Sequence, residues 1–371
     1  MSETLYVGLD LGSRNCEQLG MLSDGTVKIK SRFQTSEANL IKAFKEGKGL
    51  GKELGWEIQV HLEAGELAPW VREVIKPYVK SVDISHSRDN AWIANDPNKN
   101  DRADAYKLAE LLRMNRYRPV YYSEDQSRRE FKQLVQHYDD LTGQEVKLKL
   151  KIKSRLRVQG VIIHKGWVYT EKGFKKALEQ VKSPEIRKSI EQLHKGLKNT
   201  LEIREEALKL IREAGKKFPE IKLFEEGVPG VGFIGAVHFS AYVQTPHRFS
   251  NKRKLWRYCR LGVCQRTSDG KILTHPKLDR AGCGRLKAVA RTAFNVSVKS
   301  KKDNQFKRAY ESALEATHDQ THARLTVMRK NSFCLEGDLA DQHALSRRLG
   351  LTQPNDRGQP EGDRAFLSAT D

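Results

Sequence analysis

The chain lacks any apolar run that approaches the roughly 20 residues a membrane-spanning helix needs, and its first residues show no basic and apolar signal pattern. It has five cysteines in 371 residues, an odd number at irregular spacings that argues against a disulfide framework. Cys259, Cys264, His275 and Cys283 could be counted as zinc ligands, but without a close Cys-x-x-Cys pair reduced thiols are the better interpretation. We therefore expect a cytoplasmic protein without a membrane partner.

Acidic residues are also scarce relative to basic ones. There are 47 Asp and Glu against 67 Lys and Arg, so the formal charge is +20 and the isoelectric point is near 9.6. Such an excess favours a polyanionic partner, because cationic side chains that contact phosphates release counterions. Nucleic acid is the leading candidate. A hydrophobic content of 38% is enough for ordinary cores, and the length allows two domains with connecting helices.

The first third of the chain alternates short apolar runs with turns. Period-two patterns and turn signals predict three strands at 4–10, 17–22 and 26–33. Helical and strand patterns then alternate, with a helix at 37–46, a strand at 56–62, a helix at 67–79, a strand at 81–84 and a helix at 101–116. This is the RNase H-like order, in which the first strand lies beside the fourth in one mixed sheet.

Four carboxylates occupy special positions in this pattern. Asp10 and Glu63 end strands that we expect to be adjacent, while Asp101 and Asp104 share one helix face. Asp101 could instead be a helix N-cap and Glu63 an ordinary turn residue, and Asp96 is a nearby acidic alternative. Asp10 is harder to explain without a functional role, because it lies in an apolar strand and an unpaired buried charge is costly. Together they predict a shared site for Mg²⁺ or Mn²⁺ that acts on a phosphodiester.

The remainder of the chain is helical in character. Apolar residues recur at helical intervals from 124 to 218 and predict a helical hairpin or coiled coil. Residues 147–153 alternate strictly, as in a strand, but their helical neighbours favour a helix. From 219 to 330 the chain is richer in Gly, aromatic and basic residues, and 331–371 is expected to be a partly mobile tail.

Two stretches in the segment 219–330 suit contact with a nucleic-acid backbone. The glycine-rich loop 227–232 precedes an apolar helix at 233–243, so Gly230 and Gly232 are candidates for phosphate contact in a helix-hairpin-helix-like element. A plain loop before a helix would look the same. Residues 247–258 interleave basic and aromatic side chains, which suits neutralisation of backbone phosphates together with stacking on bases. The candidates for contact with nucleic acid in this stretch are Arg248, Lys252 and Arg253. A helix with a solvated basic face and a buried aromatic face is the alternative.

These motifs resemble those of the DEDD transposases, the bridge-RNA-guided recombinases of bacterial insertion sequences. The resemblance covers nearly all of the chain to about Lys330, and its motifs are Gly8-Leu9-Asp10, Leu62-Glu63-Ala64-Gly65, Lys99 to Ala105, Val228 to Gly232, Arg248-Phe249 and Arg280 to Leu286. It implies an α/β RuvC-like domain at 1–123, a coiled-coil linker at 124–218 and a mainly α-helical transposase domain at 219–330.

The resemblance also implies a catalytic serine. From composition alone residues 266–270 indicate only a turn. In the family a serine nucleophile follows a Gly-Leu-x-Pro segment, and Ser268 lies at the family's interval after Leu261. The chain departs from the family pattern because Arg260 and Val263 stand where the family has Gly and Pro, and Asp269 separates the serine from Gly270.

By this resemblance the protein would be a transposase and site-specific recombinase that cuts and exchanges DNA strands. Ser268 from another protomer would attack a phosphate held near the metal site, which requires a homo-oligomer, a dimer or a tetramer. A structured guide RNA would pair with donor and target DNA, while Lys149, Lys151, Lys153 and Arg155 would contact the nucleic-acid backbone. The alternative is a metal-dependent, structure-specific endonuclease like a junction resolvase, without a covalent serine intermediate. A non-catalytic nucleic-acid-binding protein is the third possibility.

Overall fold

The computed structural model describes residues 3–86, 100–163, 166–265, 267–269 and 271–340. Asp96, Arg266, Gly270 and the tail from residue 341 onward lie outside these ranges. The chain divides into two compact units, Met1–Tyr122 and Ser123–Asp371. Within the described ranges no helix is both long enough and apolar enough to cross a bilayer.

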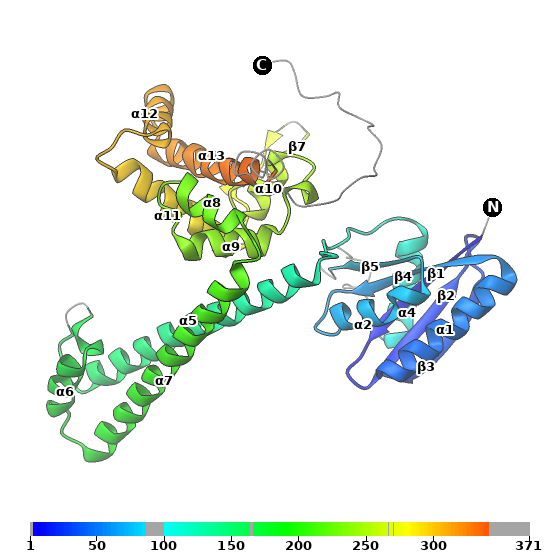
Figure 1. Ribbon diagram of the computed structural model, residues 1–371, viewed down its shortest axis with the longest axis horizontal. Coiled ribbons are helices and arrows are strands. Elements are labelled where there is room, and N and C mark those ends of the chain that lie inside the picture. The colour runs from blue at the N-terminus through cyan, green and yellow to red at the C-terminus, as the bar shows by residue number, and fades with distance from the viewer. Residues whose placement is uncertain (1–2, 87–99, 164–165, 266, 270, 341–371) are drawn as a thin grey trace. The chain divides into compact units, whose positions relative to one another are not determined.

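The N-terminal unit contains a mixed five-stranded sheet with the strand order β3-β2-β1-β4-β5 (Figure 1). β1 (Glu3–Leu11), β2 (Asn15–Met21) and β3 (Val27–Gln34) form an antiparallel meander. β4 (Trp56–Glu63) runs parallel to β1, and β5 (Ser81–Ser85) runs parallel to β4. The first strand therefore lies beside the fourth, and the predicted RNase H-like order is confirmed.

Side chains of β1 alternate between two apolar layers. Leu5, Val7 and Leu9 are buried against α1 (Glu37–Leu54) and α2 (Ala68–Ile75), which is followed by the short 3₁₀ helix η1 (Lys76–Tyr78). The opposite face, which includes Gly8, packs against α4 (Asp101–Arg113). A Cβ on Gly8 would lie 2.0 Å from the carbonyl oxygen of Ala105, so only glycine allows this helix to approach so closely.

His61 connects this face of the sheet to α4. Its Nδ1 lies 2.8 Å from the carbonyl oxygen of Leu108 in α4, and its Nε2 lies 2.7 Å from Ser85 Oγ at the end of β5. The ring is fully buried, and this burial lowers the pKa of His61 below its ordinary value. A neutral imidazole with both ring nitrogens engaged therefore fixes α4, and with it Asp104, over the sheet.

The second unit begins with a long helical hairpin. α5 (Gln126–Val158) packs along α7 (Pro184–Gly215), and the connection contains η3 (Trp167–Tyr169) and α6 (Glu171–Glu179) (Figure 1). The alternating segment 147–153 is helical, as its neighbours indicated, because Ile152 and Leu156 are buried with Ile190 and Leu197 of α7. The helical hairpin predicted for this segment is therefore present.

The rest of the second unit is a helical body with two small sheets. Its helices are α8 (Glu220–Gly227), α9 (Phe233–Val243), η4 (Pro246–Arg248), α10 (Lys252–Tyr258), α11 (Gly284–Lys299), α12 (Gln305–Thr317) and α13 (Gln320–Ala340). β6 (Val263–Cys264) pairs with β9 (Lys277–Leu278), and β7 (Thr267–Ser268) pairs with β8 (Lys271–Ile272). The mainly helical character predicted for this region is confirmed.

Asp139 of α5 anchors the helical hairpin in this body. The carboxylate is buried and accepts hydrogen bonds from His238 Nε2 at 2.9 Å and from the Tyr242 hydroxyl at 2.8 Å, both on α9. Arg285 of α11 lies 3.1 Å from the same carboxylate. Burial raises the pKa of Asp139, but the donors and the guanidinium outweigh it and hold this pKa below its usual range.

Candidate active site

Asp10 and Glu63 come together where two parallel strands end. The register pairs Leu9 of β1 with Leu62 of β4, so Asp10 and Glu63 stand side by side one residue further on. Because side chains alternate along a strand, both carboxylates lie on the face of the sheet that α4 covers. They line one cavity of about 660 Å³ with residues of the segments that follow β1 and β4. Two half-buried carboxylates thus share one opening at this edge.

Asp101 and Asp104 occupy the first turn of α4. The N-cap is Asn100, whose side chain accepts the Ala103 N–H at 2.8 Å, so Asp101 does not cap this helix. Asp104 is 4% exposed, and its Oδ1 lies 3.7 Å from Lys107 Nζ. Asp101 is exposed and lines a different hollow, beside β2 and β3. The structure therefore places Asp10 and Glu63 in one cavity and Asp101 in another.

The carboxylate pair fits a hard divalent cation. Across the ranges that the structure describes, no group of three or more His, Cys, Asp or Glu side chains is close enough to hold an ion. Mg²⁺, however, is commonly bound through one or two carboxylates, with water and substrate phosphate oxygens completing its coordination. Asp10 and Glu63 match that pattern, since both are oxygen ligands in a cavity open to a substrate.

Glu17 is a further carboxylate beside Asp10 that the sequence reasoning missed. The β1–β2 register pairs it directly with Asp10, which places the two side chains on one face with Cβ atoms roughly 4.5–5.5 Å apart. Glu17 also lies 3.2 Å from Arg32 and lines the same hollow as Asp101. Counting residues across the hairpin turn would have found it, because the register of a hairpin follows from its turn.

Ser268 lies at the tip of an exposed hairpin in the second unit. It ends β7 and pairs across the hairpin with Lys271 of β8, and both side chains are exposed. The pairing puts a cation on the same face as the hydroxyl, which the sequence reasoning did not consider. Asp269 adopts a left-handed φ of 49°, which Asp tolerates better than most residues. The Asp that separates Ser268 from Gly270 therefore serves the turn.

Basic residues of the helical hairpin differ in their surroundings. Lys151 and Arg155 are exposed. Lys149 is paired with Glu145, and its Nζ lies 5.3 Å from the centre of the Tyr169 ring. Lys153 lies 5.6 Å from the same ring. Contact of these residues with nucleic acid remains a prediction, for which Lys151 and Arg155 have the most accessible charges.

Arg248 differs from its two basic neighbours in sequence. Its guanidinium lies 4.9 Å from the Phe249 ring and 4.6 Å from the Tyr258 ring, and it donates hydrogen bonds to the carbonyls of Tyr242 and Val243. These contacts give Arg248 a role in packing α9 against α10. Lys252 and Arg253, in the first turn of α10, are instead exposed.

The two loop glycines also have different surroundings. Gly232 is exposed at the N-cap of α9, and a Cβ there would meet no atom within 4 Å. Gly230 has a φ of +83°, and its Cβ would lie 2.6 Å from Val296 Cβ on α11. Packing against α11 thus explains the glycine at 230. Of the two, Gly232 is the exposed one and is the better candidate for the predicted phosphate contact.

Replacing Gly230 by Ala should lower the free energy of unfolding by about 2–3 kcal/mol, because it adds left-handed strain to a steric clash. Gly232→Ala is the matched control and should change it by less than about 1 kcal/mol. Guanidinium denaturation followed by circular dichroism measures both. Equal midpoints for the two variants would contradict the packing role of Gly230.

Carboxylates at adjoining strand ends of an RNase H-like sheet are typical of the class of enzymes that use divalent ions on phosphate esters. Residues 7–159 match a family model described as Transposase, of the DEDD type of IS110, and residues 226–311 match one described as Transposase IS116/IS110/IS902 family. The chain therefore belongs to the DEDD transposases of the IS110 type and is a DNA-processing enzyme. DEDD transposase domains are typically dependent on divalent metal ions. A comparison with curated proteins finds no match.

Proposed function

We propose that this transposase cuts and rejoins DNA in a metal-assisted reaction with Ser268 as the nucleophile. The observation that carries the proposal is the shared cavity of Asp10 and Glu63 at adjoining strand ends. Ser268 supports it from the second unit, since this hydroxyl is exposed on a hairpin within the second matched region. We propose that Asp101 and Asp104 act with this pair from the helix that covers the same face of the sheet, although neither lines the cavity of Asp10 and Glu63.

In the proposed reaction the Ser268 oxygen attacks the phosphorus of one DNA strand and gives up its proton. A P–O bond to a sugar oxygen breaks, that oxygen takes a proton, and a phosphoserine ester remains. The ester conserves the energy of the broken bond, so a free hydroxyl of a second strand can attack it and release the serine. Divalent ions bound by Asp10 and Glu63 would stabilise charge that develops on the phosphate oxygens.

We further propose that the enzyme works as a homo-oligomer, a dimer or a tetramer, in which one protomer supplies Ser268 to the carboxylates of another. The helical hairpin supports this proposal because large apolar side chains on it face solvent. Leu150 is 61% exposed on α5, and Leu210 is 56% exposed on α7. Burying such side chains against a second copy would be favourable.

The third part of the proposal is a structured guide RNA that pairs with donor and target DNA. The net charge of +20 and the exposed Lys151 and Arg155 support it. Purifying the protein from cells that carry its own coding region with both flanks, and sequencing the RNA bound to it, tests this part. We expect one discrete RNA derived from those flanks. A broad mixture of cellular RNA, equal to that bound by an unrelated basic protein, would contradict it.

The serine chemistry is tested by incubating the purified complex with its DNA and Mg²⁺ and denaturing it with detergent. A DNA fragment that stays attached to protein is the expected product. Cleavage without any attached fragment would favour the alternative enzyme, a metal-dependent, structure-specific endonuclease in which water attacks the phosphate.

A further inference from the structure

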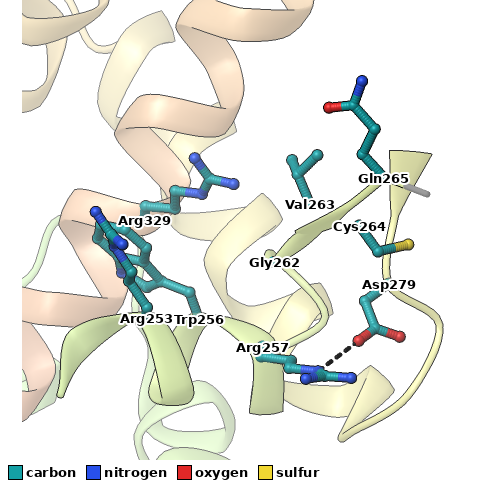
Figure 2. A pocket seen from close by; sticks show the side chains of 9 residues that line it. All are labelled: Arg253, Trp256, Arg257, Gly262, Val263, Cys264, Gln265, Asp279 and Arg329. Carbon is teal, nitrogen blue, oxygen red and sulfur yellow. Dashed lines mark hydrogen bonds and ion pairs between the residues drawn. The ribbon is translucent and has the colours of Figure 1, made fainter. Parts of the chain in front are cut away.

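A cavity of about 470 Å³ lies next to the hairpin that carries Ser268. One side is formed by Arg253 and Trp256 of α10 and by Arg329 of α13, and the other by the strand segment from Val263 to Gln265 (Figure 2). This volume is within the range of about 300–1,000 Å³ that ligand pockets occupy. All of its lining residues belong to the second unit, so the cavity is complete within it.

The charge of this cavity favours an anion. Its one lining carboxylate, Asp279, is paired with Arg257 at 2.7 Å, as the dashed line in Figure 2 shows. The guanidinium groups of Arg253 and Arg329 are then left as an uncompensated double positive charge among the lining residues. Arg253 is exposed and makes no ion pair with another described residue. A doubly cationic wall of this kind matches a phosphate group.

Arg329 is held in position for such a ligand. Its Nε and one terminal nitrogen donate to the carbonyl of Leu261 at 3.0 and 2.8 Å, and its guanidinium lies 5.2 Å from the centre of the Trp256 ring. Further N–H donors of the guanidinium remain for a ligand. The indole nitrogen of Trp256 is buried and has no hydrogen-bond acceptor among the described residues. A buried indole N–H usually has one, so this part of the cavity wall holds a polar group without a partner among the described residues.

The place of the cavity in the chain identifies the phosphate. Gln265 lines it and Ser268 follows three residues later, so their Cα atoms lie at most about 11 Å apart. That span equals about three nucleotides of duplex rise. We propose that this cavity binds a DNA backbone phosphate a few nucleotides from the one that Ser268 attacks, and so positions the strand for the serine. The inference builds on the proposed role of Ser268.

Cys264 allows a direct test, because it lines the cavity and is exposed, whereas Cys16 and Cys259 are buried. The full-length protein is treated with N-ethylmaleimide with and without mixed-sequence DNA, and modification of each cysteine is measured by peptide mass spectrometry. At a DNA concentration ten times the dissociation constant, the rate at Cys264 should fall about tenfold, because about a tenth of the protein is then free. The Ser268→Ala protein should be protected equally.

The Arg253→Ala variant tests whether the positive charge of the cavity wall binds DNA. Lys254→Ala is the matched control, since Lys254 is exposed on the same helix and does not line the cavity. We expect Arg253→Ala to weaken DNA binding, to reduce the slope of log affinity against log salt by about 1 and to lose most protection of Cys264. Lys254→Ala should retain that protection. The inference would be overturned if Cys264 were modified at an unchanged rate at saturating DNA. It would also be overturned if RNA protected Cys264 and DNA did not, or if the protein bound no DNA. Protection of Cys264 without a covalent serine adduct would instead overturn the proposed role of Ser268 and leave only the binding of a DNA phosphate in the cavity.

Discussion

Replacing Asp10 by Asn should lower the rate of DNA strand cleavage by about 10²–10⁴-fold, because a metal ion supplies several kcal/mol of transition-state stabilisation and each 1.36 kcal/mol is a factor of ten. The substitution keeps the size of the side chain and removes the negative charge that a divalent cation needs. Asp10 and Glu63 share one cavity, so Glu63→Gln should have a similar effect. The double variant should be little worse than either single one, because both groups would hold the same ions. Cleavage of end-labelled DNA in Mg²⁺ measures the rates.

Asp24→Asn is the matched control for this prediction. Asp24 precedes Gly25 in the exposed β2–β3 turn, where it accepts hydrogen bonds from Thr26 and does not line the cavity. Asn-Gly forms tight turns as readily as Asp-Gly, so the control should keep both its fold and its activity. Asp10→Asn protein that cleaves DNA at the parent's rate would remove the carboxylate site from the mechanism, and the proposed function with it.

The fold of the N-terminal unit was predictable from the sequence because local patterns and strand order point to the same sheet. The least accurate boundary was the end of α1, which was predicted at residue 46 and lies at Leu54. Three glycines at 47, 49 and 51 resemble a helix stop, but here Gly47 and Gly51 let the helix approach β4. A Cβ on Gly51 would lie 2.9 Å from the Trp56 carbonyl oxygen. Tertiary packing overrode helix propensity at these positions.

The candidate site was less predictable, because it depends on register and on packing between elements. That Asp10 and Glu63 are adjacent follows from placing the first strand beside the fourth, which the element order indicated. Glu17 becomes visible only when the β1–β2 register is known. Helix patterns do not show how far α4 extends over the sheet, and this extent determines which hollow Asp101 lines. The cavity beside Ser268 could not be foreseen either, since it joins α10 and β6 to the distant Arg329.

Replacing Ser268 by Ala should abolish the covalent protein–DNA product and lower strand exchange by about 10⁶-fold, as the loss of a serine nucleophile does in a hydrolase. The change removes one oxygen from an exposed side chain on a hairpin, so it should leave stability within about 0.5 kcal/mol of the parent. Ser312→Ala, at an exposed site on α12, is the control and should keep full activity. Detergent-resistant attachment of labelled DNA to protein measures the covalent step.

Asp10→Asn and Ser268→Ala together distinguish a recombinase from a nuclease, the two kinds of enzyme that could use the carboxylate cavity. A recombinase that forms phosphoserine needs both the carboxylates and the hydroxyl, so Asp10→Asn and Ser268→Ala should each remove cleavage and attachment. A nuclease that activates water needs only the carboxylates, so Ser268→Ala would still cut and the parent would leave no DNA on the protein. Mixing the two inactive variants separates the cases further. If Ser268 acts on the carboxylate site of another protomer, hetero-oligomers contain some sites with both intact groups, and part of the activity should return.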